Sequence, residues 1–216
     1  MRAFISWSGG KDCMFALHTF LKTPGNEAAY LVNFCEPESN KSRSHGLDKS
    51  LISAQAEAIQ IPLIQEPISS GSYEFHLKKI IAQLKEQGVQ YGVFGDIYLD
   101  AHRDWIERVC AEAEITPLFP IWGRDTRDIL HDFIQEGFKA ILVSVLKQER
   151  FKTMLGNMLD NELVATMREM EGVDPCGENG EYHTYVFDGP LFKHPVAFET
   201  GEEYADERHY FLPIHL

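Results

Sequence analysis

Ser8-Gly9-Gly10-Lys11-Asp12 gathers a hydroxyl, two glycines, an amine and a carboxylate in five consecutive residues. Two glycines let the backbone approach a bulky anion without a Cβ in the way. The apolar residues 4–7 come before this segment and residues with helical spacing follow it, so it opens a helix. The free N–H groups and positive end of a helix favour an anion, to which Ser8 and Lys11 add a hydroxyl donor and a charge. We therefore predict a phosphate-binding loop rather than a plain glycine-rich turn; it matches neither the Walker A nor the dinucleotide pattern.

Two carboxylates are placed to act beside this loop. Asp12 would repel a phosphate, which makes sense if it holds Mg²⁺ or caps the helix. Asp96 follows Gly95 at the end of the apolar run 91–95. Ligands of parallel sheets bind beyond the carboxyl ends of the strands. We expect Asp12 and Asp96 to hold Mg²⁺ and Gly95 to lie near the nucleotide, although for Asp96 a cap or turn role is an equal alternative.

A third group of polar residues lies near the C-terminus. Glu178, Glu181 and His183 fall within six residues, beside Asn179 and Gly180. Such a cluster could form an acid–base or substrate-binding loop. From the residues alone, an exposed polar turn is the commoner explanation.

Several further side chains are candidates with a structural alternative. His102 and Arg103 would lie on one helix, where Arg103 could bind substrate or simply pair with Glu107 four residues later. Cys13, in the first turn of a helix, could be a reactive thiol or a small packing residue. Cys176 has the same two explanations, and His45 sits in a polar loop where a nucleotide could bind.

These residues must be positioned by alternating strands and helices. The expected strands are 4–7, 29–34, 61–64 and 91–95, and the expected helices after the loop helix are 47–59, 72–87 and 100–113. This alternation predicts an α/β fold with a doubly wound parallel sheet. The pattern changes after residue 116, with Asp125 as the N-cap of a helix to 136 and a strand at 138–146. We predict a nucleotide-binding domain at 1–116 and a smaller α+β substrate-binding domain at 117–216.

The composition excludes several classes of protein. The chain has 216 residues, a 44% hydrophobic share and a net charge of -13, so it can form a core but should repel nucleic acid in general. Its four cysteines contain no C-x-x-C spacing, which disfavours a zinc ribbon or a paired redox site. No segment approaches the length of a membrane span. We expect a reduced, cytoplasmic protein.

Five segments together resemble a known family. They are Ser8-Gly9-Gly10-Lys11-Asp12, Gly95-Asp96-Ile97, His102-Arg103 with Trp105-Ile106-Glu107, Pro117-Leu118-Phe119-Pro120-Ile121-Trp122 and Gly177-Glu178-Asn179-Gly180-Glu181-Tyr182-His183-Thr184. The first resembles the PP-loop of ATP-pyrophosphatases, and the set is similar to the diphthine–ammonia ligase family. The resemblance implies an adenine nucleotide α-hydrolase-like fold, with ATP and Mg²⁺ as cofactors.

The resemblance also implies roles for individual residues. It implies ATP binding by Ser8, Gly9, Gly10, Lys11, Asp12, Cys13, Gly95 and Asp96, with Mg²⁺ on Asp12 and Asp96. It implies substrate binding by His102, Arg103, Asn179, Gly180 and Thr184, and catalysis by Lys11, Asp12, Glu178, Glu181 and His183.

The implied reaction is amide formation. A small-molecule or protein-borne carboxylate would be adenylated with release of pyrophosphate, and ammonia, free or from a partner, would then attack. A homodimer is one option for the oligomeric state. Two alternatives stay open: a PP-loop enzyme that thiolates tRNA through a cysteine persulfide, and a module that binds adenine nucleotides without turnover.

One departure from the family pattern concerns the substrate. Family members read Glu-Gly-Gly-Glu-x-Glu where this chain reads Glu178-Asn179-Gly180-Glu181-Tyr182-His183. A carboxylate can pair with the trimethylammonium group of diphthine, whereas a neutral imidazole cannot. This variant resembles a sister subgroup associated with cobalamin-type salvage. We therefore expect a substrate other than diphthine, with His183 determining the choice.

Overall fold

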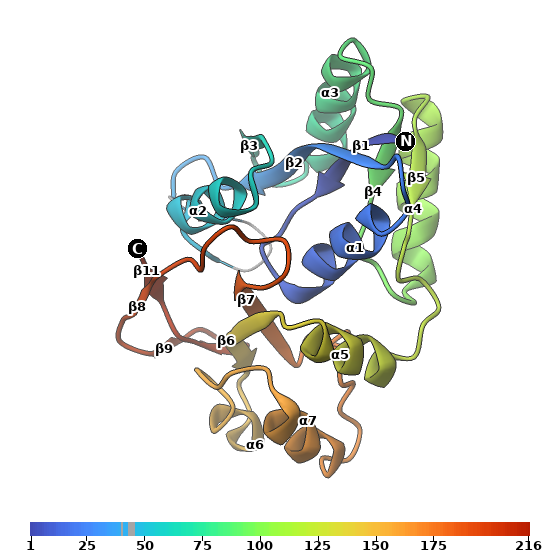
Figure 1. Cartoon of the computed structure of the whole chain (residues 1–216). Coiled ribbons are helices and arrows are strands. Elements are labelled where there is room, and N and C mark those ends of the chain that lie inside the picture. The colour runs from blue at the N-terminus through green and yellow to red at the C-terminus, as the bar shows by residue number, and fades with distance from the viewer. Residues whose placement is uncertain (40, 43–45) are drawn as a thin grey trace.

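The N-terminal half is built on a parallel sheet of five strands (Figure 1), seen in a computed structural model that describes residues 1–39, 41–42 and 46–216. The strand order is β3-β2-β1-β4-β5. The strands are β1 Arg2–Ser6, β2 Glu27–Cys35, β3 Leu63–Pro67, β4 Tyr91–Val93 and β5 Thr116–Leu118. The helices of this half are α1 Lys11–Leu21, α2 Lys49–Ile59, α3 Tyr73–Lys85 and α4 Asp100–Glu112. The predicted doubly wound α/β sheet is thus confirmed.

Helices cover both faces of this sheet because its strands are apolar on both sides. In β1, Ala3 and Ile5 belong to the buried cluster that contains residues of α1 and α2. Phe4, between them, belongs to the buried cluster that contains residues of α3 and α4. A central parallel strand with both faces covered is a continuous apolar run rather than an alternating one, as residues 3–5 are.

The C-terminal half contains an antiparallel sheet with the strand order β7-β6-β10-β9 and a small pair, β11-β8. Its strands are β6 Lys139–Leu146, β7 Tyr182–Asp188, β8 Glu199–Thr200, β9 Tyr204–Ala205, β10 His209–Phe211 and β11 Ile214–His215. Its helices are α5 Thr126–Gln135, α6 Glu149–Lys152 and α7 Asn161–Arg168. The predicted N-cap is present, since the Asp125 side chain accepts a hydrogen bond from the Arg127 N–H.

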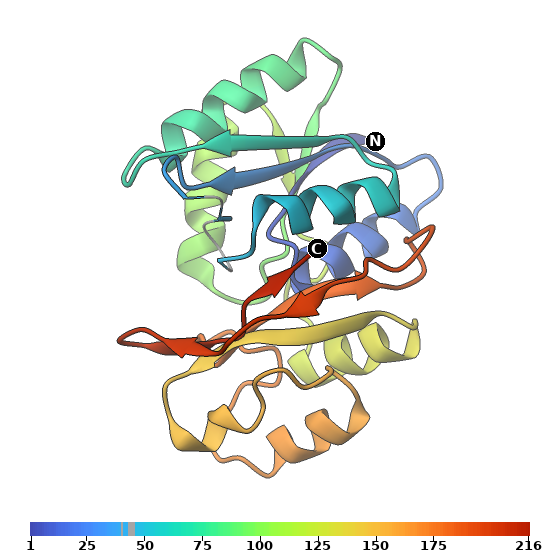
Figure 2. The same ribbon diagram turned by 90° about the vertical axis from the view of Figure 1, so that its left-hand side faces the viewer.

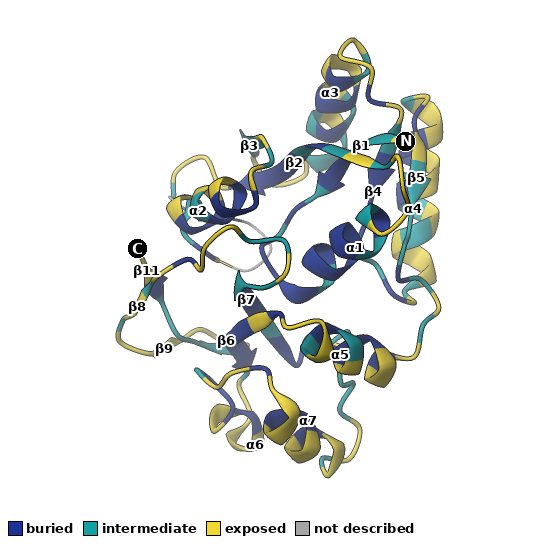
Figure 3. Ribbon diagram, in the orientation of Figure 1, coloured by how far each residue is buried: buried dark blue, intermediate teal, exposed yellow. Residues whose placement is uncertain are grey.

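The two halves share one core. Helices α1 and α2 lie between the parallel sheet and the antiparallel sheet (Figure 2). A single buried cluster contains side chains of β1, α1 and α2 together with side chains of β6, β7 and α5. Figure 3 shows α1 buried over most of its length. The helix that follows the phosphate loop is therefore held from both sides.

The boundary between the two halves lies slightly after residue 116, where the sequence pattern changes. Residues 117 and 118 belong to β5, which pairs with β4 at the edge of the parallel sheet. The predicted boundary at 117 falls inside this strand, and the two-domain division stays a prediction. Among the described residues, no helix is long and apolar enough to span a membrane.

Candidate active site

The predicted phosphate loop, residues 8–12, spans the connection from β1 to α1, and its last two residues, Lys11 and Asp12, are the first two of the helix. Gly9 has φ +85°, a conformation that favours glycine. A Cβ on Gly9 would lie 2.5 Å from Ile52 Cδ1 and 2.9 Å from Gln55 Oε1, so α2 leaves no room for a side chain here. The Gly10 N–H donates to Ser8 Oγ at 3.3 Å. At Gly9 and Gly10 the loop therefore has a compact backbone without side chains, as an anion site needs.

Strand β7, from the other half of the chain, completes the loop. The Lys11 N–H, at the first residue of α1, donates to Thr184 Oγ1 at 3.1 Å. The Val186 N–H donates to the Gly9 carbonyl at 3.1 Å. The N-terminal loop and the predicted C-terminal cluster, far apart in sequence, are thus in direct contact.

Lys11 is buried and turned toward the C-terminal half. Its Nζ donates to the Asp12 carboxylate at 2.8 Å and to the Cys176 carbonyl, and it lies 5.1 Å from the centre of the Tyr182 ring. Burial disfavours the charged amine, but the charge of Asp12, followed by Tyr182 and Cys176, outweighs it and raises the pKa of Lys11 above its usual value. The amine is therefore a permanent positive charge in the site.

A cavity of about 380 Å³ opens between the two halves at the carboxyl ends of β1 and β4. β1 and β4 are neighbours in the sheet, and the strand order reverses between them. Open α/β sheets bind their ligands at such a switch point. The predicted residues that line the cavity are Ser8, Lys11, Asp12, Cys13, Gly95, Asp96, His102, Glu178, Gly180, His183 and Thr184. The predicted residues outside its lining are Gly9, Gly10, Arg103, Asn179 and Glu181.

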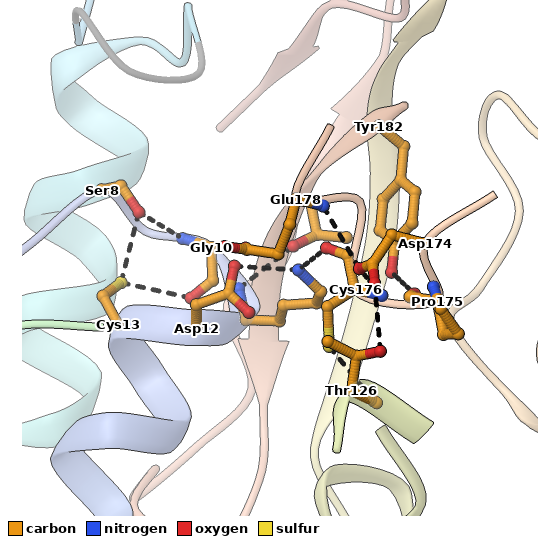
Figure 4. Close-up of polar contacts among 12 residues, drawn as sticks. Ser8, Gly10, Asp12, Cys13, Thr126, Asp174, Pro175, Cys176, Glu178 and Tyr182 are labelled. Carbon is orange, nitrogen blue, oxygen red and sulfur yellow. Dashed lines mark hydrogen bonds and ion pairs between the residues drawn. The ribbon is translucent and has the colours of Figure 1, made fainter. Parts of the chain in front are cut away.

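Three carboxylates face this cavity. Figure 4 shows Asp12 at the start of α1 and Glu178 across from it, on the C-terminal side. Burial, followed by repulsion from Asp12, raises the pKa of Glu178 to about 7. Burial also raises the pKa of Asp96, while His102, 3.4 Å away, opposes this shift and Asp12 adds to it. The site concentrates negative charge that a bound cation would relieve.

Asp12 has one carboxylate oxygen that is free to accept from a ligand. Its Oδ1 is buried and has no hydrogen-bond partner among the residues that the structure describes, while its Oδ2 pairs with Lys11. A buried acceptor without a partner is costly unless a ligand supplies one. In the described part of the chain, no three His, Cys, Asp or Glu side chains form a group able to hold a metal by themselves.

Glu181 organises the Gly-rich loop instead of facing the cavity. Its carboxylate accepts hydrogen bonds from the Asp174 N–H at 2.8 Å and from the Asn179 N–H at 2.9 Å, and one from Asn179 Nδ2 at 3.1 Å. Asp174 in turn accepts from the Cys176 N–H at 2.8 Å and from Thr126 Oγ1 at 3.1 Å. Sequence analysis missed Asp174, although an Asp that opens a glycine-rich loop is a common turn former.

His183 is a half-buried, neutral imidazole in the cavity wall. Burial, followed by the positive charge of Lys11 and by His209, lowers its pKa to about 4. The His209 ring, on β10, lies 6.0 Å away between centres. The position that carries a carboxylate in the family pattern is therefore uncharged here at neutral pH.

Arg103 turns away from the cavity. Its guanidinium lies 4.8 Å from the centre of the Trp122 ring and 5.4 Å from that of Phe119, and its Nε donates to Glu107 at 2.7 Å. This is the helix pair that sequence analysis gave as the alternative for Arg103. His102, by contrast, lies at the cavity wall, largely exposed. His45 lies outside the described residues.

The cysteines of the site are buried thiols. All four cysteines are free and buried. Burial raises the pKa of both Cys13 and Cys176. Cys13 Sγ donates to the Gly10 carbonyl at 3.2 Å, and Cys176 Sγ donates to the Thr126 carbonyl at 3.3 Å. A thiolate nucleophile is therefore disfavoured at both positions.

One wall of the cavity is apolar and was not predicted. It includes Trp7, Val32, Phe34, Tyr73 and Leu99. The Phe34 and Tyr73 rings pack with their centres 4.4 Å apart. The available signal was the position of Val32 and Phe34 near the carboxyl end of β2, next to the strand that carries the phosphate loop. This wall can hold a flat, apolar part of a ligand whose charged part lies at the phosphate loop.

Comparisons with known proteins agree with this geometry. The family model described as "Diphthamide synthase N-terminal domain" matches residues 1–117, and the one described as "Diphthamide synthase C-terminal domain" matches residues 125–215. Proteins named "Diphthine--ammonia ligase" from Mus musculus and Homo sapiens are 29% and 27% identical to this chain, over 99% of its length and 89% of theirs.

One solved structure is also similar. It is described as a "predicted subunit of tRNA methyltransferase from Methanocaldococcus jannaschii" and shares 16% identity over 91% of this chain and 100% of its own, with a TM-score of 0.47. That score is too low to carry an argument about fold or function. The two family models together account for both halves that enclose the cavity, and the chain belongs to the diphthamide synthase family, in which the relatives named above are diphthine–ammonia ligases.

Proposed function

We propose that this chain is an ATP-dependent ligase that activates a carboxylate as an acyl-adenylate and converts it to an amide with ammonia. The observation that carries the proposal is the shared cavity, where Ser8, Lys11 and Asp12 meet Glu178, His183 and Thr184. Family membership supports the same chemistry, since the relatives that this chain matches over 89% of their length are named diphthine–ammonia ligases.

The first step would use the phosphate loop. An oxygen of the acceptor carboxylate attacks the α-phosphorus of ATP, the bond to the β-phosphate oxygen breaks, and pyrophosphate leaves. The loop N–H groups and the Ser8 hydroxyl are suited to hold that leaving group, as donors fixed in advance at the place where charge develops. Lys11 would supply the positive charge, because its raised pKa keeps the amine protonated.

Mg²⁺ fits the donors present in this cavity. Asp12 and Asp96 would hold it, since Mg²⁺ usually takes one or two protein carboxylates and completes its shell with substrate phosphates and water. The unpartnered buried Oδ1 of Asp12 supports this assignment. Bound Mg²⁺ supplies charge neutralisation for the departing pyrophosphate.

Glu178 suits the second step. Ammonia attacks the acyl carbon, the bond to the AMP oxygen breaks, and the nitrogen must lose a proton. A carboxylate with a pKa of about 7 can accept that proton near neutral pH. Glu181, which we expected to be catalytic, makes its contacts inside the loop, so we propose that it positions Glu178 and Asn179 instead.

The acceptor that we propose is a carboxylate compound other than diphthine. The neutral His183 offers no charge to the trimethylammonium group of diphthine at the place where the family pattern has a carboxylate. Cytoplasmic location and the lack of a nucleic-acid partner are further parts of the proposal. The net charge of -13 supports the last of these.

Product analysis of ATP turnover tests the proposal. The protein is incubated with ATP, Mg²⁺, ammonium and a panel of carboxylates that includes cobalamin precursors and a diphthine-bearing protein. We expect AMP and pyrophosphate in amounts that depend on one acceptor, with the matching amide. Lys11→Met should remove this turnover, whereas Lys22→Met, an exposed residue at the opposite end of α1, should not.

The outcomes separate the two alternatives. Turnover that is lost in the Cys13→Ser, Cys176→Ser double variant and yields a thiolated product would favour the tRNA-thiolating class. Tight ATP binding without AMP release for any acceptor would favour a nucleotide-binding module. Either result would contradict amide ligation.

A further inference from the structure

The side-chain amide of Gln55 joins three segments behind the phosphate loop. Gln55 lies on α2 and is fully buried, with an exposure of 0%. Its Nε2 donates to the Gly9 carbonyl at 2.9 Å and to the Val186 carbonyl at 2.5 Å. Its Oε1 accepts from Trp7 Nε1 at 3.1 Å. One amide therefore ties α2 to the loop and to β7.

These partners fix the orientation of the amide. Both donors face carbonyl oxygens and the acceptor faces an indole N–H, so every partner is matched. The opposite orientation would place the amide oxygen against two carbonyl oxygens and its NH₂ group against the indole donor. A side chain without an amide would leave the Val186 carbonyl without this donor and the Trp7 N–H without this acceptor, which is costly in a buried site.

The hold on the Gly9 carbonyl has a consequence on the other side of the same peptide. In a trans peptide the C=O and the following N–H point in opposite directions. The Gly9 carbonyl is directed at Gln55 and at the Val186 N–H. The Gly10 N–H is therefore directed away from α2, and it donates to the hydroxyl of Ser8, a residue that lines the cavity.

Gly9 cannot set this orientation by itself. It has no side chain, and its φ of +85° lies in a region that glycine adopts about as readily as the regions of negative φ. A freely turning peptide here would exchange an N–H that faces the anion for a carbonyl oxygen that repels it. Something outside the loop must hold the plane of the peptide.

We propose that Gln55 is a positioning residue for the pyrophosphate end of ATP. By donating to the Gly9 carbonyl, Gln55 holds this oxygen toward α2, and it thereby presents the Gly10 N–H to the leaving group. This inference rests on the proposed function, because it assumes that the loop binds the β- and γ-phosphates. Gln55 is not part of the cavity lining, so it acts through the loop backbone and not on the ligand itself.

Tyr185 offers a matched control. Its hydroxyl is buried and donates to the Leu51 carbonyl at 3.1 Å, so it also ties β7 to α2, but it does not touch the loop. Tyr185→Phe and Gln55→Met each remove buried hydrogen bonds between the same two elements. Only Gln55→Met removes one of the two hydrogen bonds to the Gly9 carbonyl, and the bond from the Val186 N–H remains.

The experiment is calorimetric titration of the full-length chain with two probes in the presence of Mg²⁺. Inorganic pyrophosphate occupies the proposed leaving-group site, whereas AMP lacks the phosphates that the loop would hold. We expect Gln55→Met to weaken pyrophosphate binding by about tenfold or more, the equivalent of one buried hydrogen bond left unmade. AMP binding should change less than about twofold, and Tyr185→Phe should change neither affinity.

Three results would overturn the inference: unchanged pyrophosphate affinity in Gln55→Met, an equal loss for AMP, or an equal loss in Tyr185→Phe. If Gln55→Met does not fold, Gln55→Asn, which keeps the amide but is one methylene shorter, replaces it under the same criteria. Failure of the unaltered chain to bind pyrophosphate at all would instead contradict the proposed function, and the inference with it.

Discussion

This chain departs from the family pattern at two positions, Asn179 and His183, and only the second replaces a carboxylate. The imidazole is neutral because burial, Lys11 and His209 lower its pKa to about 4. A neutral ring can exchange hydrogen bonds with an acceptor but cannot offset a cation. We therefore propose that the choice of acceptor depends on His183, a side chain that lines the cavity without belonging to the phosphate loop.

His183→Glu should change acceptor selectivity and leave nucleotide binding in place. The new carboxylate would favour acceptors that carry a positive charge, by about tenfold or more in kcat/KM relative to the unaltered chain. The measurement is kcat/KM for cationic and neutral carboxylate acceptors, alongside ATP affinity. Loss of ATP binding in this variant would sink the idea.

Protonation of Glu178 should make the stability of the folded chain depend on pH. Its pKa is about 7 in the folded chain against 4.5 without the fold. The folded state binds more protons between these values, so the stability that this group contributes is present below the lower value and is lost as pH rises through about 7. His183 has the opposite sign, with a folded pKa of about 4 against 6.5, and its contribution is lost as pH falls.

Glu178→Gln isolates the first of these effects. The variant should gain about 1–2 kcal/mol of stability relative to the unaltered chain between about pH 4 and about pH 8, after allowance for partial solvent screening. Urea unfolding across this range measures the difference, in which the His183 contribution cancels. Parallel stability curves for the two proteins would show that the Glu178 carboxyl is not held in its protonated form.

At the scale of elements, the site depends on how closely β4 approaches the start of α1. A Cβ on Gly95 would lie 2.8 Å from the Asp12 carbonyl carbon and 2.8 Å from the Cys13 nitrogen. These are backbone atoms of a helix and cannot move aside as the end of a side chain can. A glycine at 95 therefore allows Asp96 and Asp12 to face one cavity.

Gly95→Ala should separate β4 from α1. We expect a loss of about 1–3 kcal/mol in stability from overpacking, together with a rise in the KM for ATP of about tenfold or more. Gly88→Ala is the control, since it has open space but a φ of +81°, and should cost stability through strain alone. Thermal unfolding and steady-state kinetics give both quantities. An unchanged KM in Gly95→Ala would contradict the role of this contact.

Periodicity and loop chemistry predicted most of the elements. The helices at 47–59, 72–87 and 100–113 correspond to α2, α3 and α4 within two residues at each end, because each has a regular apolar face. Strand β5 was missed because it has only three residues, one of them Pro117, and a strand this short has no period to detect. Its pairing with β4 comes from tertiary contacts.

The candidate site was predicted only in part for a related reason. Charged and glycine-rich segments stand out in the sequence, and they gave Lys11, Asp12, Asp96 and Glu178. Gln55 and Tyr73 sit inside helices, where their spacing matches ordinary core or surface positions. Their roles arise from which segments meet in space. Glu181 has the right type of side chain, but its partners lie in its own loop.

At the scale of the whole molecule, the two halves depend on one another. The buried cluster under α1 and α2 continues into β6, β7 and α5. Lys11 has the Cys176 carbonyl and the Tyr182 ring as partners, both from the C-terminal half. The predicted domains at 1–116 and 117–216 therefore share a core and a site, whatever their evolutionary origin.

A fragment of residues 1–124 should not fold into a nucleotide-binding unit. It would expose the face of α1 and α2 that the C-terminal half covers, and it would leave Lys11 without those partners. We expect a broad, non-cooperative thermal transition by circular dichroism and ATP binding weakened by about a hundredfold or more. A cooperative transition with ATP affinity like that of the full chain would show that the first half is an autonomous domain.

The contacts from Thr184 and Val186 to the phosphate loop also set an order of events during synthesis. Thr184 and Val186 follow the loop residues that they contact by more than 170 positions, and so they are translated well after them. Nascent domains usually fold from the N-terminus as they emerge. Here the phosphate loop lacks these two contacts until β7 has been made, so we expect a growing chain or a truncated product to carry the motif without the complete site.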